Sequence, residues 1–146
     1  MLFSLFTPTH KATYLKDAYA SLQRQTVTDW EWVVVPNGPE YPEIRDYLAE
    51  LTKGDKRVKI VTYNNATTSV GLLKKYACDQ CTGDVLVEYD HDDVLATGCL
   101  AEISLRAAGC PANTFFFSDD VTCTFDGKLV LFDQSLGWKH YESELD

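Results

Sequence analysis

Three aspartates within four residues, Asp90, Asp92 and Asp93, are the group in this sequence with the clearest capacity for chemistry. Carboxylates this close together repel one another, so the cluster is costly unless solvent or a cation relieves the repulsion. Carboxylate oxygens suit Mg²⁺ or Mn²⁺, which commonly share their coordination shell between one or two protein carboxylates and substrate phosphates. The alternative is a solvated acidic turn before a helix, whose dipole favours aspartate. The cluster alone leaves both interpretations open.

The aspartates follow one of several apolar runs that alternate with helical patterns. β-branched and aromatic runs predict strands over residues 2–6, 30–35, 57–63, 84–89 and 114–117. Apolar residues at helical spacing predict helices over residues 13–25, with Thr13 as N-cap, 43–51, 69–81 and 95–108. Two alternating segments then flank Asp126 and Gly127, a strong signal for a β-hairpin. This order predicts a single α/β domain over residues 1–146, with a mainly parallel, Rossmann-like sheet flanked by helices and a C-terminal β-hairpin.

The strand ends indicate where a ligand would bind. In open α/β sheets, ligands bind beyond the carboxyl ends of the strands. The segments that follow three of the predicted strands there are residues 7–10, 36–38 and 90–93. We therefore expect these segments to form the site.

Four blocks of sequence accompany the aspartates. They are SLFTPTH at residues 4–10; YL, SLQRQT and DWEWVVV at 14–15, 21–26 and 29–35; SVG at 69–71 followed by Lys74 and Lys75; and TGD and YDHDD at 82–84 and 89–93. In order and spacing these blocks resemble family 2 glycosyltransferases of the GT-A fold, over residues 3–133. The resemblance implies a metal-dependent, inverting glycosyltransferase of polysaccharide biosynthesis, which transfers a sugar from a nucleotide diphosphate sugar donor to a saccharide or other glycan acceptor.

The resemblance also implies roles at individual positions. Thr7 and Pro8, with Thr9 beside them, would line the nucleotide pocket largely through main chain. Asn37 stands where the family usually has an aspartate that accepts from the base ring. Lys74 matches a basic position near the diphosphate.

The aspartates take the remaining roles in the same comparison. Asp92 would lie by the ribose and the metal, Asp93 would be the direct ligand of Mn²⁺ or Mg²⁺, and Asp90 would support them. Such a metal and Lys74 would offset the charge that develops on the leaving diphosphate.

The sequence departs from the family pattern at several points. The Asn37 amide can accept from a pyrimidine N–H but can also donate, so the donor base stays open. His10 stands where Tyr-Asn is common, and a surface histidine without a role is an equal interpretation. The family's general base lies in a second half beyond residue 146, and Asp119 and Asp120 are poor substitutes for it. We therefore expect the acceptor-binding half to be absent or truncated, or supplied by a partner chain.

Composition narrows the partners and the compartment. The net charge of -9, from 22 acidic and 13 basic residues, disfavours nucleic acid. The five cysteines, Cys78 and Cys81 among them, fall in predicted helices and strands as packing residues, which favours a reducing, cytoplasmic setting. The sequence shows no signal peptide and no apolar stretch long enough for a transmembrane segment.

Three rival functions stay open. One is a catalytically silent module that binds a nucleotide or glycan for a partner, and another is a plain α/β interaction domain whose acidic turn only caps a helix. Nucleotidyl transfer is disfavoured, because TPTHKAT at residues 7–13 lacks the glycines of a phosphate-binding loop.

The aromatic residues Trp30, Trp32 and 115–117 are expected to pack in the core, whereas Trp138 could cover an edge or stack on a sugar.

Overall fold

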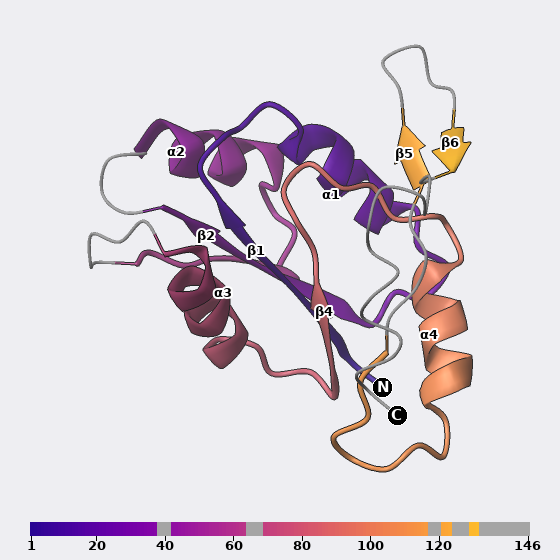
Figure 1. Ribbon diagram of the computed structural model, residues 1–146. Coiled ribbons are helices and arrows are strands. Elements are labelled where there is room, and N and C mark those ends of the chain that lie inside the picture. Colours follow the sequence, from indigo (N-terminus) through magenta and orange to yellow (C-terminus); the bar gives the residue numbers. More distant parts are fainter. Residues whose placement is uncertain (38–41, 64–68, 117–120, 124–128, 132–146) are drawn as a thin grey trace. The chain divides into compact units, whose positions relative to one another are not determined.

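The computed structural model describes residues 1–37, 42–63, 69–116, 121–123 and 129–131. Two compact units, Met1–Gly109 and Cys110–Asp146, are each described by themselves. The first unit contains β1 (Phe3–Thr9), α1 (Leu15–Gln23), β2 (Trp30–Pro36), α2 (Pro42–Leu51), β3 (Val58–Ile60), α3 (Val70–Asp79), β4 (Val85–Glu88) and α4 (Cys99–Ala107) (Figure 1). The second unit contains β5 (Val121–Cys123) and β6 (Leu129–Leu131), which pair antiparallel as the predicted hairpin requires.

The sheet of the first unit has the strand order β3-β2-β1-β4, and each neighbouring pair is parallel. β1 and β2 are buried at all seven positions of each strand. Burial on both faces is typical of a parallel sheet whose crossover helices cover it. The predicted α/β fold with a mainly parallel sheet is confirmed.

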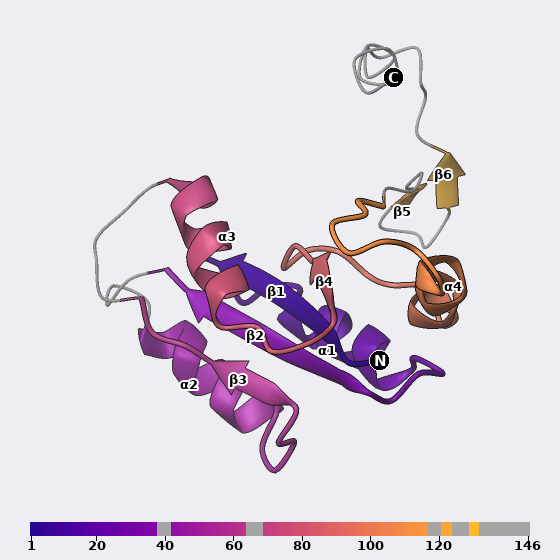
Figure 2. The ribbon, with the colours of Figure 1, turned by 90° about the horizontal axis from the view of Figure 1, so that it is seen from below.

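Two cores form because side chains alternate between the faces of a strand. On one face, Leu5 and Trp32 pack with residues of α1, α2 and α4. On the other face, Phe6 and Val33 pack with Leu73 of α3. Figure 2 shows α3 on one side of the sheet and α1 and α2 on the other. The predicted core positions of Trp30 and Trp32 are confirmed.

Three predictions about the elements are wrong. Thr13 does not cap α1, because the N-cap position is Tyr14 and no side chain caps the helix there. Residues 95–98 are not helical, because the Leu95 nitrogen bonds to Ser21 of α1, and the carbonyls of Ala96 and Thr97 accept from Gln25 Nε2 and the Thr26 nitrogen just after α1. Phe115 is 81% exposed, because residues 114–116 form no strand and follow Asn113, whose φ of 75° turns the chain.

Several predictions fall outside the described residues. They concern Asp119, Asp120, Trp138, Phe117 and the turn at Asp126 and Gly127. None of the helices in the described part of the chain has the length and apolar character of a membrane span.

A polar cluster around the buried Glu31 joins β1, β2 and β3 to the residues just before β4. Glu31 of β2, with its side chain 8% exposed, accepts hydrogen bonds from Ser4 Oγ of β1 at 2.6 Å and from the Thr82 main-chain nitrogen before β4 at 2.6 Å. Lys59 Nζ of β3 lies 2.5 Å from Glu31 Oε2. Burial raises the pKa of Glu31, but the bonds from Lys59, Ser4 and Thr82 outweigh it and hold the pKa at about 2. We call Ser4, Glu31, Lys59 and Thr82 the Glu31 cluster.

The Glu31 cluster predicts a loss of stability in acid. Since the folded-state pKa of about 2 lies below the ordinary value of 4.5, the contribution of Glu31 is complete above about pH 4.5 and is lost as the pH falls toward 2. Glu31→Gln is expected to lower the free energy of unfolding by about 2 kcal/mol at pH 7. Urea titrations from pH 7 to pH 2 should show the two proteins converging in acid. Glu50→Gln, at an exposed ion pair, is the control, and a difference independent of pH would contradict the assignment.

The close packing around Gly83, at the amino end of the sheet, gives a second prediction about stability. A Cβ at Gly83 would lie 2.6 Å from the Leu2 carbonyl oxygen and 2.7 Å from Ser4 Oγ, so Gly83→Ala must displace main chain. We expect the free energy of unfolding to fall by about 2 kcal/mol. Gly71→Ala in α3 meets no atom within 4 Å and should change stability little or raise it by up to about 1 kcal/mol. Equal urea midpoints for the two variants would contradict this close approach.

Candidate functional site

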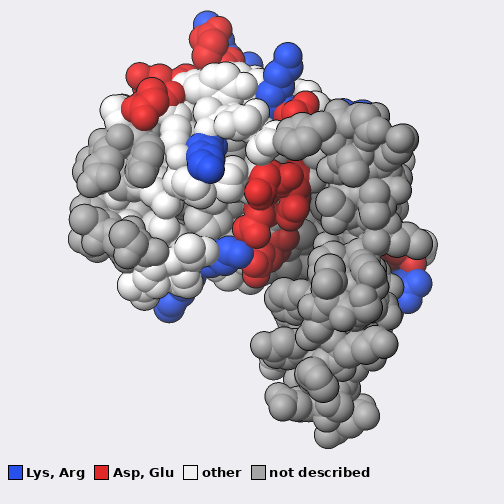
Figure 3. Space-filling view, turned by 45° about the horizontal axis from the view of Figure 1, so that its top comes forward, with Lys and Arg blue, Asp and Glu red and all other residues white. Residues whose placement is uncertain are grey.

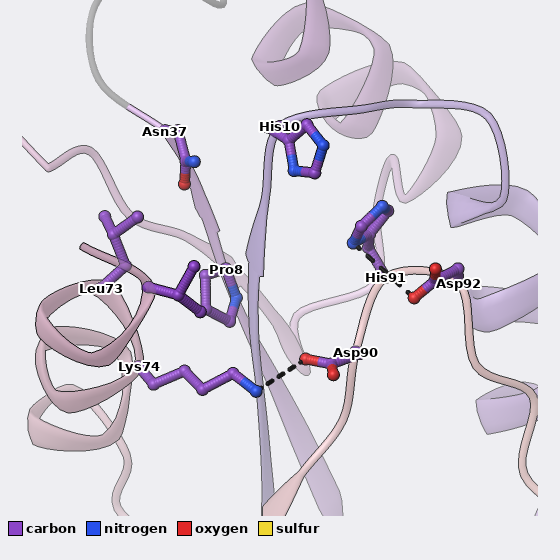
Figure 4. Close-up of a pocket in the computed structure, with 9 residues that line it drawn as sticks. Pro8, His10, Asn37, Leu73, Lys74, Asp90, His91 and Asp92 are labelled. Carbon is purple, nitrogen blue, oxygen red and sulfur yellow. Dashed lines mark ion pairs between the residues drawn. The ribbon is translucent and has the colours of Figure 1, made fainter. Parts of the chain in front are cut away.

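A pocket of about 250 Å³ lies at the carboxyl end of the parallel sheet. Its walls come from the ends of β1, β2 and β4 and from the first turns of α3 (Figure 4). The lining residues are Pro8, His10, Asn37, Val70, Leu73, Lys74, Asp90, His91 and Asp92. The three segments that follow strand ends therefore meet around one cavity.

Lys74 brings a cation to this pocket from α3. The helix begins after Ser69, whose Oγ accepts from the Leu72 nitrogen at 3.4 Å, and this start directs the Lys74 side chain toward β4. Lys74 Nζ lies 3.1 Å from Asp90 Oδ1 and also pairs with Glu88. Burial lowers the pKa of Lys74, but Glu88 and Asp90 outweigh it and raise the pKa above its ordinary value. The ammonium group is therefore held charged at the pocket wall.

The acidic turn, Asp90–Asp93, forms the opposite wall. The Asp93 main-chain nitrogen donates to the Asp90 carbonyl at 3.2 Å and closes the turn. The side chains of Asp90 and Asp92 are 46% and 56% exposed, and the Asp90 carboxylate is directed toward Lys74 (Figure 4). Their oxygens therefore stay accessible to a ligand.

Two histidines occupy the space between β1 and the acidic turn. The rings of His10 and His91 meet edge to face, with centroids 5.1 Å apart. His91 Nδ1 lies 3.9 Å from Asp92 Oδ1. Sequence reasoning did not single out His91, although its place between Asp90 and Asp92 was the available signal.

Not every residue expected at the site lines the pocket. Pro8, Asn37, Lys74, Asp90 and Asp92 do so, whereas Thr7, Thr9 and Asp93 are not among the lining residues.

Thr7 and Thr9 direct their hydroxyls elsewhere. Thr7 Oγ1 donates to the Tyr89 carbonyl at 2.6 Å and accepts from Trp32 Nε1 at 2.8 Å. Thr9 Oγ1 donates to the Lys11 carbonyl at 2.8 Å. The Thr7 side chain therefore joins β1 to the end of β4 inside the protein.

Asn37 carries an unpaired acceptor at the pocket. Its Oδ1 is buried and has no hydrogen-bond partner among the described residues. A buried acceptor without a partner costs on the order of 1 to 3 kcal/mol, so an N–H donor from a ligand would relieve this cost. Figure 4 shows the Asn37 side chain extending from the end of β2 toward the pocket.

The acidic turn fits a divalent metal only in part. In the described residues, no three histidine, cysteine, aspartate or glutamate side chains are arranged to hold a metal ion by themselves. Mg²⁺ and Mn²⁺ need only one or two protein carboxylates when substrate phosphates complete the shell. The carboxylates of Asp90 and Asp92 at one wall therefore fit a metal that binds together with a diphosphate.

The surface charge opposes the binding of an anionic ligand. On the face shown in Figure 3, Asp and Glu side chains form a continuous band, and the chain carries a net charge of -9. A diphosphate would be repelled by this field unless a metal or Lys74 offset it.

Comparison with known proteins identifies a family that this chain matches. The chain matches the family described as "Glycosyl transferase family 2" over residues 4–113, the family that its motifs resemble. It is 28% identical over 122 residues to the O-antigen biosynthesis protein RfbC of Myxococcus xanthus, a match that covers 82% of this chain and 9% of RfbC.

Solved structures share the fold. S. aureus TarS 1–349 in complex with UDP-GlcNAc superposes with a TM-score of 0.64 at 22% identity, over 74% of this chain and 31% of that 1–349 chain. The mannosyltransferase PcManGT from Pyrobaculum calidifontis, in complex with GDP-Man and Mn²⁺, gives a TM-score of 0.60 at 18% identity, over 75% of this chain and 32% of PcManGT. This chain thus spans about a third or less of the proteins that it matches, and the predicted fold class is confirmed.

The two threonine side chains of β1 are expected to contribute unequally to the free energy of unfolding. Thr7→Val would leave the Tyr89 carbonyl and Trp32 Nε1 unpaired in the core, so the free energy of unfolding should fall by about 2 kcal/mol or more. Thr9→Val removes a bond made only within its own loop and should lower it by less than about 1 kcal/mol. Urea unfolding of both variants measures the difference. If Thr7→Val is as stable as the wild type, the buried role of its hydroxyl is wrong.

Proposed function

Because the chain belongs to glycosyl transferase family 2, we propose that its pocket binds a nucleoside diphosphate sugar, together with Mn²⁺ or Mg²⁺, and that the protein transfers the sugar to a saccharide or other glycan acceptor with inversion. One observation carries the proposal. Lys74, the carboxylates of Asp90 and Asp92 and the unpaired amide oxygen of Asn37 converge on one cavity at the carboxyl end of the sheet. The name of RfbC, an O-antigen biosynthesis protein, favours a role in polysaccharide biosynthesis.

Each group has a proposed task in binding the donor. Asn37 Oδ1 accepts a hydrogen bond from the base, which satisfies an acceptor that has no partner among the described residues. Pro8 borders the nucleotide through main chain. Lys74 exchanges part of its contact with Asp90, now 3.1 Å away, for the diphosphate oxygens. This exchange needs no new charge in the pocket, because the raised pKa keeps Lys74 protonated.

The acidic turn has the proposed task of holding the metal and the ribose. Asp92, which lines the pocket, would lie by both; Asp93, which does not line it, would be the direct metal ligand by its match to the family motif, and Asp90 would support them. When bound, the metal neutralises the charge that develops on the leaving diphosphate. Lys74 adds a second positive charge on the same group, so this chain's own contribution is to hold the diphosphate and stabilise its departure.

The acceptor and the general base are proposed to lie elsewhere. The matched part of RfbC is 9% of that protein and the matched part of TarS 1–349 is 31%, so a further segment or a partner chain is the proposed source of both. We also propose a reducing, cytoplasmic setting, because Cys78, Cys81 and Cys99 are free thiols in the described part of the chain.

Thermal unfolding with nucleotides tests donor binding. UDP, GDP and dTDP, each with and without Mn²⁺, cover the bases named for the solved relatives and one more. A ligand at 100 times its Kd stabilises the folded state by about 2.7 kcal/mol, which should raise the Tm by about 5 °C or more for a chain of this size. The shift should require Mn²⁺ with at least one nucleotide.

Variants identify the groups that produce the shift. Asp93→Ala and Lys74→Met should abolish or strongly reduce the shift. Asp46→Asn, at an exposed site on α2, removes a negative charge as Asp93→Ala does and should leave the shift intact. No shift with any nucleotide contradicts the proposal for this chain. A shift without release of the nucleotide, when a donor sugar and glycan acceptors are added, favours the silent binding module instead.

A further inference from the structure

Tyr89 joins the acidic turn to the rest of the protein. It is the last residue before the turn and is 1% exposed. Its main-chain nitrogen donates to the Phe6 carbonyl at 3.2 Å, and its carbonyl accepts from Thr7 Oγ1 at 2.6 Å. Both main-chain groups are therefore bonded to β1, and the turn starts from a fixed position.

The Tyr89 hydroxyl reaches the other end of the same turn. It lies 3.0 Å from the Asp93 carbonyl oxygen, 3.0 Å from the Ala18 carbonyl oxygen and 2.8 Å from Ser21 Oγ. Ser21 Oγ in turn lies 2.8 Å from the Ala18 carbonyl oxygen and accepts from the Leu95 nitrogen at 3.2 Å. The Tyr89 hydroxyl thus contacts Asp93, the last residue of the turn, and Ser21 of α1 contacts Leu95, two residues after it.

Counting protons fixes the direction of these bonds. The two hydroxyls have one proton each, and two carbonyls compete for them. The Asp93 carbonyl lies within reach of the Tyr89 proton, whereas the Ala18 carbonyl lies within reach of both protons. The arrangement that serves both carbonyls has Tyr89 donating to Asp93 and Ser21 donating to Ala18.

The segment after the acidic turn is also hydrogen-bonded to the residues that follow α1. Gln25 follows the end of α1 and is 6% exposed; its Nε2 donates to the Ala96 carbonyl at 2.8 Å, and its Oε1 accepts from the Leu100 nitrogen at 3.1 Å. The Thr26 nitrogen donates to the Thr97 carbonyl at 3.2 Å. The chain after Asp93 therefore cannot move away from α1 and the residues that follow it without losing its bonds to Ser21, Gln25 and Thr26.

We propose that the Tyr89 hydroxyl is a positioning group, which closes the acidic turn onto α1 and so presents the aspartates in the arrangement that binds the metal and the diphosphate. This inference rests on the proposed function. The three aspartates repel one another, and a turn held at one end only would open to separate them. With its last carbonyl bonded to Tyr89, the turn is ordered before a ligand arrives, and binding does not have to supply that ordering.

A packing role for the ring alone is the competing explanation. The Tyr89 ring lies 6.3 Å from the ring of Trp32 in the core, and phenylalanine would preserve this contact. Tyr89→Phe therefore removes the hydroxyl and keeps the ring. Thr52→Val is the matched control, because it removes a buried hydroxyl that donates to the Leu48 carbonyl at 2.8 Å, at the end of α2.

The experiment measures Mn²⁺ affinity and amide exchange in the same proteins. Mn²⁺ is titrated in the presence of the nucleotide that gives the thermal shift, with the free ion followed by electron paramagnetic resonance. Tyr89→Phe should weaken Mn²⁺ binding on the order of tenfold, which is typical of the loss of a group that orients metal ligands. Hydrogen exchange of the Asp93 and Leu95 amides should become faster. Thr52→Val should lower the Tm without changing either value.

The outcomes separate this inference from the proposed function. If the wild type binds no Mn²⁺ with any nucleotide, the proposed function fails, and the exchange rates still decide whether Tyr89 orders the turn. If Asp93→Ala abolishes binding but Tyr89→Phe binds within twofold of the wild type, the positioning role is overturned. Equal weakening by Tyr89→Phe and Thr52→Val overturns it as well, because general destabilisation then explains both. Ser21→Ala, which removes the acceptor of the Leu95 nitrogen, provides the same test if Tyr89→Phe does not fold.

Discussion

The burial of β1 is the constraint on which the rest of the first unit depends. All seven of its residues lie inside the protein, so its main-chain groups need partners on both sides, and β2 and β4 supply them in parallel. Parallel pairing brings the carboxyl ends of these strands to one edge of the sheet. Pro8, Asn37 and Asp90 lie around one pocket for this reason, although they are distant in the sequence.

The carboxylates at the two ends of the sheet differ in burial and in pairing. At the amino end, Glu31 is buried, and Ser4, Thr82 and Lys59 satisfy its oxygens, so it contributes to stability and has no accessible oxygen to offer a ligand. At the carboxyl end, Asp90 and Asp92 are about half exposed. Within the described ranges, Asp90 pairs with Lys74, which it shares with Glu88. The carboxylate at the amino end of the sheet therefore stabilises the fold, whereas those at the carboxyl end stay accessible to a ligand.

Lys74 and Tyr89 act on the acidic turn from opposite sides. Lys74 comes from α3 on one face of the sheet and balances the charge of Asp90. Tyr89 packs in the core on the other face and reaches α1, where its hydroxyl meets Ser21 and the carbonyl of Asp93. The turn therefore depends on both layers of helices, which explains why buried residues remote from the pocket are expected to affect ligand binding.

The order of strands and helices was predictable from the sequence, because the periods of 2.0 and 3.6 residues that distinguish them are local. The motif around Asp90–Asp93 and its place after a strand were visible for the same reason. The structure alone showed that Thr7 bonds to Tyr89, that Lys74 pairs with Glu88, and that residues 95–97 bond to Ser21, Gln25 and Thr26 outside any helix of their own. Thr7 and Tyr89 are 82 positions apart, and no local pattern records which hydroxyl will meet which carbonyl. Local periodicity thus determined the elements, whereas hydrogen bonds between distant segments decided how the site is held.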